Sequence, residues 1–596
     1  MIYLLVTLFR AMHSGDMKQP MALICCSLLG FVGLVNGLPR DTIVHEDMSF
    51  WLKSGQENLQ RNLAYRNNEN RAKNIIIFIG DGMGISTITA GRIYKGQQLK
   101  GTNGEEYKLA FEKFPNTGFA KTYNTDKQVP DSAGTATAIF SGVKCRYRVL
   151  GLDTKASYDH CDKRIDQTSK VTTIADWAQQ SGMDTGFVTT TRITHATPAG
   201  LYAHINNRDW ECDTAIPKRY KDCVKDIARQ LFEDAPGNKF KVIMGGGGQH
   251  LGIPMGPIDP DTCVRGDGRN LVEFWTKNNP DGKVVTNTEQ LLSVDIANAT
   301  KILGVFAASH LPYHAVKTEE TPSLANMTAQ AIKLLRKTDN GFLLMVESGK
   351  IDIAHHHNYA KMALRELSEL EEAILVALQL VKLEETLVIV TADHSHSFTI
   401  NGYPNRGNDI LGFANDPNKP NGTFYETLSY INGPGFFHHR RNDSTNVNDT
   451  WNPVDRDETR DDPFYTHMAG IYLKDETHGG EDVGVYAAGQ RRYALSLFFF
   501  SRSPSSPTNV DANPNFLFLS GPYSHLIRGT FEQNYIAHVV AYAACFKDWP
   551  SHCDNAYNRY FYELTNSVNR TASSSPLYSS LFAFLAILIV LNYNSN

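Results

Sequence analysis

Short apolar runs, each followed by glycine or polar residues, recur along the chain. Residues 74–79 are continuously apolar after the first position, as expected for a strand that is buried on both faces. Further runs predict strands at residues 184–190, 240–244, 342–346 and 387–391. Helices are expected at residues 86–95, 171–181 and 361–382. This alternation predicts an α/β fold with a large, mostly parallel central sheet that helices flank on both faces.

The pattern is less regular towards the two ends of the chain. Residues 46–66 favour a helix before the first strand, and residues 483–487 favour a strand that resumes the sheet. Residues 402–477 are rich in Gly, Asn, Pro and Asp, and only residues 426–431 within them favour a strand. This stretch is expected to be an inserted surface subdomain.

Ionisable side chains follow the predicted strands, at the edge where an open α/β sheet places its active site. These residues are Asp81, Glu347, Asp352, Asp393 and His394. Because the carboxyl ends of parallel strands meet at one edge, we expect the five side chains to converge there. Several buried carboxylates in one place need compensating cations, and metal ions are the obvious source.

The spacing of aspartate and histidine residues also favours metal binding. His356 follows Asp352 by four residues, so both lie on one face if the segment is helical, and such a pair can share a zinc ion. Three consecutive histidines at residues 355–357 leave the choice of ligand open, and a His-rich surface turn is the alternative. His478 adds another imidazole, and the two glycines after it allow a close approach to a site.

Ser132 begins a run of small residues that is typical of a closely packed helix. Either Asp131 or Ser132 could cap this helix, and its free N–H groups could hold a phosphate or a sulfate. An ordinary capped helix is the alternative. Arg208 could clamp a phosphate through two N–H groups, unless it pairs with Asp209 or Glu211.

The composition of the 596-residue chain excludes some functions. Charged residues make up 20% of the chain, hydrophobic residues make up 42%, and the formal net charge is −5. This composition is that of an ordinary globular protein, and it lacks the basic surplus that would indicate nucleic-acid binding.

Both ends of the chain carry targeting signals. Residues 1–37 contain an apolar core behind Lys18 and small residues for cleavage, which indicates a signal peptide with an N-terminal extension unless Met21 is the start. Residues 566–596 combine small residues, a short polar spacer and an apolar tail, which is typical of a glycosylphosphatidylinositol (GPI) anchor signal. A short membrane span is the alternative. Both interpretations predict an extracellular protein on a membrane.

Cysteines and glycosylation sequons fit a secreted protein. Seven of the nine cysteines follow the predicted signal peptide, and this odd number leaves one thiol free or paired elsewhere. Sequons predict glycosylation on surface loops at Asn298, Asn326, Asn421, Asn442 and Asn448, with a sixth sequon at Asn569.

Six short motifs stand out in this chain. They surround Asp81, Ser132, His195 with Thr197, Glu347 with Asp352, Asp393 to His396, and His478. In sequence and order they resemble the motifs of the animal, membrane-anchored alkaline phosphatases. The resemblance extends from about residue 46 to residue 553, which is nearly the whole mature chain.

The resemblance implies a role for each of these residues. Ser132 would be the nucleophile that becomes phosphoserine, and Arg208 would bind the phosphate oxygens. The ligands of one zinc ion would be Asp352, His356 and His478, and those of the other would be Asp81, Asp393 and His394. The magnesium ligands would be Asp81, Thr197 and Glu347, with His195 close by and with His396 supporting a zinc ligand. Each subunit would thus hold two zinc ions and one magnesium ion and hydrolyse phosphate monoesters to an alcohol and inorganic phosphate.

Three positions depart from the family pattern. Thr197 stands where many animal relatives have serine, and it keeps the hydroxyl ligand. Ala307 and Thr321 stand at two acidic positions of the calcium site of mammalian relatives, which argues against calcium here. The resemblance also implies the disulfides Cys161–Cys223 and Cys545–Cys553, whereas Cys145, Cys212 and Cys263 have no assigned counterpart.

The resemblance further implies how the chain is organised. Residues 38–401 and 478–565 would form the catalytic domain, and residues 402–477 would form a crown-like subdomain at the axis of a homodimer. The mature protein would lie on the extracellular face of the plasma membrane, held by its GPI anchor.

Two other functions remain to be weighed. A phosphodiesterase or sulfatase on the same fold typically replaces Ser132 by threonine or a modified cysteine, and it lacks Arg208 and the magnesium set. A binding protein on an inactive phosphatase fold would lack at least one metal ligand, and none is missing here. The serine motif and the complete ligand set therefore favour the phosphomonoesterase.

Overall fold

The computed structural model describes residues 48–63, 65–99, 102–414, 425–438, 462–488, 491–493 and 517–546. Residues Met1–Leu63 form one compact unit and residues Ala64–Asn596 form another. The described part of the first unit is helix α3 (Met48–Leu63). The predicted signal peptide, the GPI signal, Cys553 and four sequons lie outside the described residues; these sequons are Asn421, Asn442, Asn448 and Asn569.

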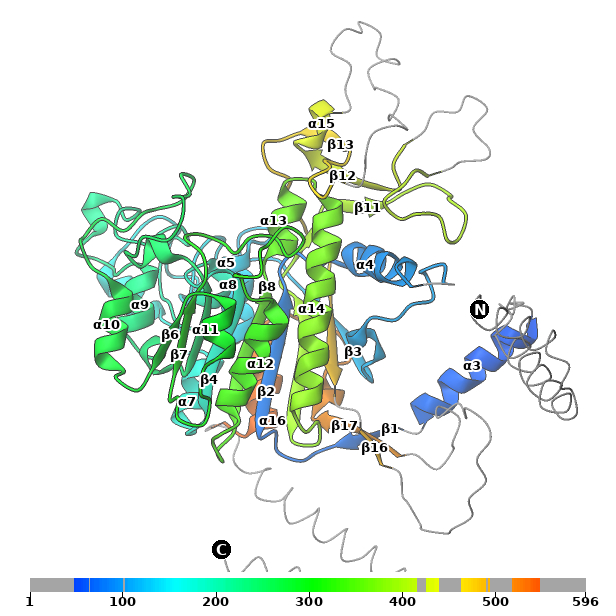
Figure 1. The fold of residues 1–596 in the computed structure, drawn as a ribbon, viewed down its shortest axis with the longest axis horizontal. Helices are drawn as coiled ribbons and strands as arrows, with labels where there is room; N and C mark the ends of the chain where they lie inside the picture. Colours follow the sequence, from blue (N-terminus) through cyan, green and yellow to red (C-terminus); the bar gives the residue numbers. More distant parts are fainter. Residues whose placement is uncertain are drawn as a thin grey trace, which may run out of the picture. The chain divides into compact units, whose positions relative to one another are not determined.

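A ten-stranded sheet is the centre of the second unit (Figure 1). In spatial order its strands are β18 (Gly529–Glu532), β3 (Asn116–Lys121), β15 (Val483–Ala488), β9 (Thr386–Ala392), β2 (Asn74–Gly80), β8 (Phe342–Ser348), β4 (Asp184–Arg192), β5 (Val242–Gly246), β7 (Ile302–Val305) and β6 (Lys283–Val285). Neighbouring strands are parallel, except that β15 runs antiparallel to both β9 and β3. The predicted large, mostly parallel sheet is confirmed.

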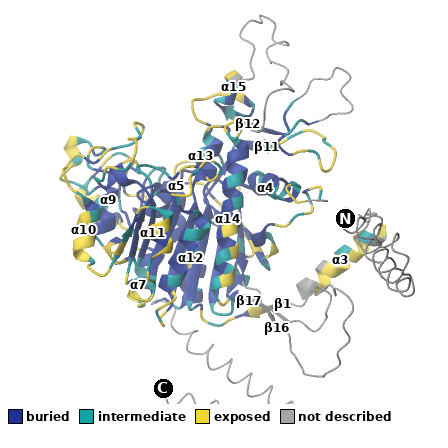
Figure 2. Cartoon of the chain, in the orientation of Figure 1, coloured by how far each residue is buried: buried dark blue, intermediate teal, exposed yellow. Residues whose placement is uncertain are grey.

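The central strands are buried on both faces, as their apolar sequences predict (Figure 2). Every residue of β2, β8 and β9 is buried. Strand β3 lies near the edge of the sheet and alternates buried with exposed residues. Because burying one large apolar side chain contributes about 1.5–3 kcal/mol, these buried strands help to hold their carboxyl ends in place.

Helices cover both faces of the sheet (Figure 1). On one face, α14 (Ala360–Leu380) packs against α4 (Ile85–Gln97), α12 (Leu324–Leu335) and α13 (Lys350–His356), and α12 also contacts α11 (Thr288–Leu292). On the other face, α5 (Ser132–Ser141) packs against α7 (Ile174–Gln180), α8 (Ala196–Ala199) and α16 (Tyr535–Ala544). The described residues also form the helices α6 (Lys163–Ser169), α9 (Ile227–Glu233), α10 (Leu271–Asn278) and α15 (Gly435–His438).

The described residues also form three small sheets. The first contains β11 (Phe398–Ile400), β12 (Leu428–Gly433) and β13 (Ala469–Tyr472), and it overlaps the insert expected over residues 402–477. The second contains β1 (Tyr65–Asn68), β17 (Leu517–Pro522) and β16 (Arg491–Tyr493), and the third pairs β10 (Ser395–His396) with β14 (His478–Gly479). The third sheet positions the site, because its register places His396 opposite His478.

The helix expected over residues 46–66 is too long at its C-terminal end. Helix α3 ends at Leu63, and Tyr65 and Arg66 lie in β1, which pairs in parallel with β17. Strand β17 is more than 440 residues away in sequence, so local propensity could not predict this pairing.

Disulfides account for most of the cysteines. The implied bond Cys161–Cys223 is confirmed, and its Cα atoms are 6.3 Å apart. Cys212 and Cys263, which had no assigned partner, bond to each other across a Cα separation of 6.1 Å. Cys545 is disulfide-bonded, and its implied partner Cys553 lies outside the described residues. Cys145 is the free cysteine of the described chain and is fully buried.

Cys145 should resist alkylation in the folded protein. Burial raises the pKa of its thiol to about 12, so the reactive thiolate is scarce at pH 8, and the sulfur is also inaccessible. We expect iodoacetamide at pH 8 to modify Cys145 only after guanidinium denaturation, as measured by mass spectrometry of its peptide. Modification of the folded protein at the rate of an ordinary thiol would contradict this placement.

Two predicted glycosylation sites lie among the described residues. Asn298 is exposed in the loop between α11 and β7. Asn326 lies in the first turn of α12 rather than in a loop, and it is partly buried. Across the described part of the chain, no helix combines the length and the apolar character needed to cross a membrane.

Candidate active site

The sheet brings the predicted ionisable residues to its carboxyl edge. Strand β2 lies between β8 and β9, and the register pairs Ile79 with Glu347 and Gly80 with Ala392. Asp81 follows β2, and Asp393 with His394 follows β9. All four ionisable side chains are fully buried. Helix α13 then carries two more predicted residues, Asp352 and His356, to the same edge.

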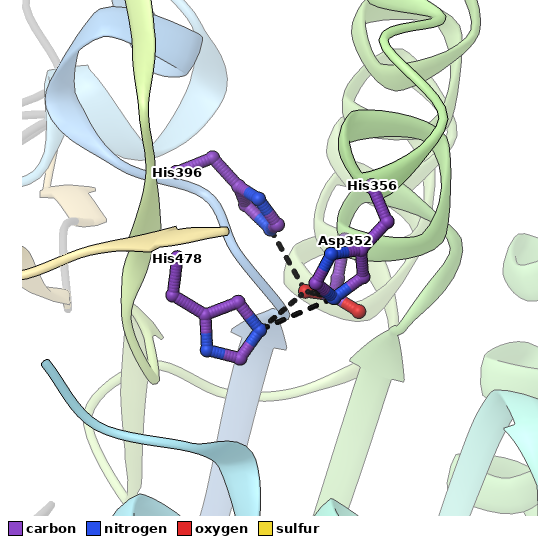
Figure 3. Close-up of side chains that lie close together, drawn as sticks. All are labelled: Asp352, His356, His396 and His478. Atoms are coloured by element: carbon purple, nitrogen blue, oxygen red, sulfur yellow. Dashed lines mark hydrogen bonds and ion pairs between the residues drawn. The ribbon is translucent and has the colours of Figure 1, made fainter. Parts of the chain in front are cut away.

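Asp352, His356, His396 and His478 form one candidate metal-binding group (Figure 3). The Asp352 Oδ1 atom lies 2.8 Å from His396 Nε2, 3.3 Å from His356 Nε2 and 3.4 Å from His478 Nε2. The two Nε2 atoms of His356 and His478 are 3.2 Å apart. The predicted helical spacing of Asp352 and His356 is therefore realised in α13.

Hydrogen bonds to backbone carbonyls indicate which ring nitrogen of His356 and of His478 carries a proton. Nδ1 of His356 faces the carbonyl oxygen of Glu476 at 2.5 Å, and Nδ1 of His478 faces that of Pro130 at 2.9 Å. Each Nδ1 must carry a proton to donate to a carbonyl, so in its neutral, metal-binding form each ring directs an Nε2 lone pair at Asp352. Burial would lower the pKa of His356, but its neighbours, of which Asp352 has the largest effect, raise it. Lone pairs and a carboxylate cannot be held this close without a cation, so this donor set fits a metal ion.

His396 differs from these two rings, because both of its nitrogens face carboxylates. Nε2 contacts Asp352, and Nδ1 contacts Glu476 Oε2. Burial would lower the pKa of His396, but Glu476 and Asp352 outweigh it and raise this pKa to about 10. Similarly, burial would raise the pKa of Asp352, but His356 and the other imidazoles hold it well below its usual value. His396 is thus a cation beside Asp352.

Asp81, Asp393 and His394 form a second group. Nε2 of His394 lies 3.2 Å from Asp393 Oδ2 and 3.5 Å from Asp81 Oδ1, while its Nδ1 faces the Ser395 carbonyl at 3.2 Å. Burial raises the pKa of both Asp81 and Asp393 and lowers the pKa of His394. Burial thus favours the neutral, metal-binding form of the His394 imidazole, whereas the two carboxyls would need a cation beside them to be ionised.

Asp81, Glu347 and His195 form a third group. Buried atoms without a hydrogen-bond partner among the described residues point into it: Asp81 Oδ2, Glu347 Oε1, His195 Nδ1 and the Thr197 hydroxyl. Burial raises the pKa of Glu347 to about 7, against the lowering effect of nearby threonine hydroxyls. Because buried polar atoms are normally paired, these orphaned oxygens fit a bound cation that prefers oxygen ligands.

Ser132 is the first residue of α5, and Asp131 is its N-cap. The Asp131 carboxylate accepts hydrogen bonds from the backbone N–H groups of Ala133 (3.1 Å) and Gly134 (3.3 Å). Of the two caps that the sequence allowed, the structure therefore has Asp131. Gly134 is required here because a Cβ atom would collide with the side-chain amide of Asn124.

The Ser132 hydroxyl is free of the capping role and points at the second group. Its Oγ lies 3.0 Å from His394 Nε2 and 3.5 Å from Asp81 Oδ1. Burial lowers the pKa of His394 and its Nδ1 faces the Ser395 carbonyl, so Nε2 of the neutral ring is unprotonated and the serine O–H donates to it.

Arg208 lies beside Ser132 and is not the partner of its sequence neighbours. Its Nη1 donates to Asp131 Oδ2 at 3.2 Å and its Nη2 donates to His195 Nε2 at 3.0 Å. Asp209 and Glu211 instead pair with Arg148 and Arg192, respectively. Burial would lower the pKa of Arg208, but the surrounding carboxylates, of which Asp131 has the largest effect, together outweigh it, so the guanidinium is firmly charged.

Sequence reasoning missed several residues that support the site. Glu476 accepts from the Ser397 backbone N–H and hydroxyl, both at 2.6 Å, in addition to its contact with His396. Gln533 donates to the Asp393 carbonyl at 2.7 Å from a distant part of the chain. Of these two residues, only Glu476 could have been found from the sequence, because it stands two residues before His478. The other histidines of the triplet point elsewhere, as expected: His355 contacts Thr87 and Tyr430, and His357 is exposed.

The arrangement of the sheet is similar to that of solved bacterial structures. An alkaline phosphatase from the Antarctic bacterium TAB5 matches with a TM-score of 0.51 at 22% identity, over 80% of this chain and 100% of that one. The Thermus thermophilus alkaline phosphatase matches with a TM-score of 0.53 at 19% identity, over 81% and 93%. A mutant of the TAB5 enzyme is described with magnesium bound. The fold is therefore that of the alkaline phosphatase-like α/β proteins.

Sequence comparison narrows this class to a family. The alkaline phosphatase family model matches residues 72–546. Alkaline phosphatase 4 of Drosophila melanogaster is 47% identical over 539 residues, which cover 86% of this chain and 84% of that protein. The membrane-bound alkaline phosphatase of Bombyx mori is 39% identical, over 84% and 86%. The chain belongs to the alkaline phosphatase family, and it is a phosphomonoesterase.

Proposed function

We propose that this phosphomonoesterase transfers phosphate from a monoester to Ser132 and then to water, with two zinc ions and one magnesium ion per subunit. The observation that carries this proposal is the position of the Ser132 hydroxyl. It lies in the first turn of α5, 3.0 Å from His394 Nε2, and Arg208 is bound to the neighbouring residue Asp131. Three groups of metal-type ligands surround this position.

The zinc ligands we propose are neutral imidazoles and carboxylates. One set is Asp352, His356 and His478, and the other is Asp81, Asp393 and His394. His396 belongs to neither set, because both of its ring nitrogens are engaged with carboxylates and no lone pair remains for a metal. It instead orients Asp352, as the outer partners of metal ligands commonly do.

The magnesium ligands we propose are the oxygens of Asp81, Thr197 and Glu347. His195 is excluded by its tautomer: Arg208 can only donate, so Nε2 of His195 accepts and Nδ1 carries the proton. That N–H has no partner among the described residues and would donate to a water molecule beside the ion. Magnesium usually keeps several waters, which fits this arrangement.

The chain's own residues perform the bond-making steps. The Ser132 oxygen attacks phosphorus, the bond to the substrate's ester oxygen breaks, and the departing alcohol gains a proton. Water then attacks phosphorus in the phosphoserine, the Ser132 oxygen leaves with a proton, and inorganic phosphate is released. Arg208 would bind phosphate oxygens with its remaining N–H groups, and the positive end of the α5 dipole would favour the anion. The metal ions, when bound, would neutralise the negative charge that develops on the attacking and leaving oxygens.

We also propose that the mature protein is a GPI-anchored homodimer on the extracellular face of the plasma membrane. The resemblance of the chain ends to targeting signals supports this placement, and the Bombyx mori relative is described as membrane-bound. The separate sheet of β11, β12 and β13 would belong to the crown-like subdomain at the dimer axis.

Metal removal tests the proposed cofactors. We expect dialysis against a chelator to lower hydrolysis of p-nitrophenyl phosphate by at least about a hundredfold, because the buried carboxylates lose their countercharge. Zinc together with magnesium should restore activity, and elemental analysis of the restored enzyme should give two zinc ions and one magnesium ion per chain. Undiminished activity in a metal-free sample would contradict the proposal.

A further inference from the structure

Arg192 and Glu211 form a buried ion pair beside the site. Arg192 is the last residue of β4, and Glu211 lies three residues after Arg208. The Arg192 Nε donates to both Glu211 oxygens at 3.1 and 3.0 Å, and Nη2 donates to Oε1 at 2.7 Å. The two side chains are only 11% and 6% exposed, respectively. The pair therefore joins the end of a central strand to the loop that carries Arg208.

Glu211 holds a second residue of the segment that follows β4. Its Oε2 accepts a hydrogen bond from the Thr194 hydroxyl at 2.5 Å, and Thr194 directly precedes His195. Burial would raise the pKa of Glu211, but Arg192, together with His250 and His195, outweighs it and keeps this pKa far below its usual value. The carboxylate is thus charged, and it fixes the backbone on both sides of Ile193.

Arg192 also reaches His195 by two routes. Its carbonyl oxygen accepts from the His195 backbone N–H at 3.0 Å. Its Nη1 contacts the Nε2 of His310, and the ring of His310 packs edge-on against that of His195, with centroids 5.3 Å apart at 77°. The backbone hydrogen bond is independent of the side chain at residue 192, so it is the contact through His310 that makes the position of the His195 ring depend on the Arg192 guanidinium.

His195 in turn positions the guanidinium of Arg208. This guanidinium has two side-chain acceptors among the described residues, Asp131 and His195, at 3.2 and 3.0 Å. A planar guanidinium that is held at two points has one orientation, which leaves its remaining N–H groups directed at the proposed phosphate. If His195 moves, one of these two points is lost.

We infer that Arg192 and Glu211 are positioning residues for phosphate binding, which they serve by fixing His195 and, through it, Arg208. This inference rests on the proposed role of Arg208. A buried ion pair alone is weak grounds for a contribution to stability, because apolar replacement of such pairs is often neutral. Its contacts with His195 and with the Arg208 loop explain why charged groups occupy this position.

The inference predicts a specific loss of phosphate affinity. In the metal-loaded enzyme, Arg192→Met should raise the inhibition constant of inorganic phosphate by about tenfold, because Arg208 loses part of its orientation. Should the single variant fail to fold, the Arg192→Met/Glu211→Leu double variant removes both charges and is measured instead. Arg92→Met is the matched control, because Arg92 makes the same three contacts with Glu112 away from the site. Its phosphate inhibition constant should equal that of the wild type.

A double-mutant cycle separates positioning from a general structural role. Arg208→Ala should itself weaken phosphate inhibition, and adding Arg192→Met should then cause little further loss, because Arg192 acts through Arg208. If the two substitutions weakened phosphate inhibition independently, so that their effects added in the double variant, the inference would be overturned. It would also be overturned if Arg192→Met kept wild-type phosphate affinity while Arg208→Ala bound phosphate weakly. Unchanged phosphate affinity in Arg208→Ala would instead refute the proposed role of Arg208, and the inference would fall with it.

Discussion

Replacing Ser132 with alanine is expected to lower kcat/KM for p-nitrophenyl phosphate by about a thousandfold or more, because the chain loses its nucleophile. Residual activity is compatible with direct attack by water on the substrate. The helix itself should persist, because its cap is Asp131 and the first turn keeps both capping hydrogen bonds. Circular dichroism and thermal unfolding of the variant should therefore resemble those of the wild type.

Ser141→Ala is the matched control for this experiment. Ser141 is buried in the same helix, and its hydroxyl bonds only to local backbone groups, with the Thr137 carbonyl at 2.6 Å. We expect this variant to keep wild-type activity. The wild-type enzyme, quenched in acid after exposure to radiolabelled substrate, should carry label on the peptide that contains Ser132. Full activity in Ser132→Ala, or label on a different peptide, would refute the phosphoserine mechanism.

Asp81→Asn is expected to cause a loss of similar size, about a thousandfold, with the loss of both zinc and magnesium. Asp81 is the residue that the second and third groups share: Oδ1 faces His394 and Ser132, and Oδ2 points into the group with Glu347. Asparagine keeps the shape of the side chain but removes the charge that both ions would need. Metal content, measured by elemental analysis of the purified variant, is the direct readout.

The same substitution at the opposite edge of the sheet provides the control. Asp184 is partly buried at the amino end of β4, and burial raises the pKa of its carboxyl, but it lies far along the strand from the site. Asp184→Asn should therefore retain both metals and wild-type kinetics. If Asp81→Asn bound two zinc ions and one magnesium ion as tightly as the wild type does, the shared-ligand assignment would be wrong.

The sequence predicted the central sheet well, because strands that are buried on both faces consist mostly of apolar residues. The runs at residues 74–79, 342–346 and 387–391 became β2, β8 and β9 with shifts of one or two residues at their ends. The convergence of Asp81, Glu347 and Asp393 followed from the same logic, since adjacent parallel strands end at one edge. Local pattern and sheet geometry together were sufficient for these residues.

Other features depend on contacts between distant segments, which leave no local pattern. The reversed direction of β15, the pairing of β10 with β14 and the Cys212–Cys263 bond are of this kind. Gln533 supports Asp393 across 140 residues of sequence, and nothing near Gln533 marks it as part of the site.

By itself, the sequence determined which residues can form buried strands and which donor atoms stand at their ends, because both follow from side-chain chemistry at fixed spacing. It left open whether Asp131 or Ser132 caps the helix and whether Arg208 pairs with its neighbours. Only the tertiary structure decided these points. In the structure Asp131 caps the helix, Asp209 pairs with Arg148, and Glu211 pairs with Arg192. The Ser132 hydroxyl and the Arg208 guanidinium are therefore not engaged by these residues, and both face one site. A hydrogen bond is made with whichever partner lies within about 3 Å, and only the folded chain determines that distance.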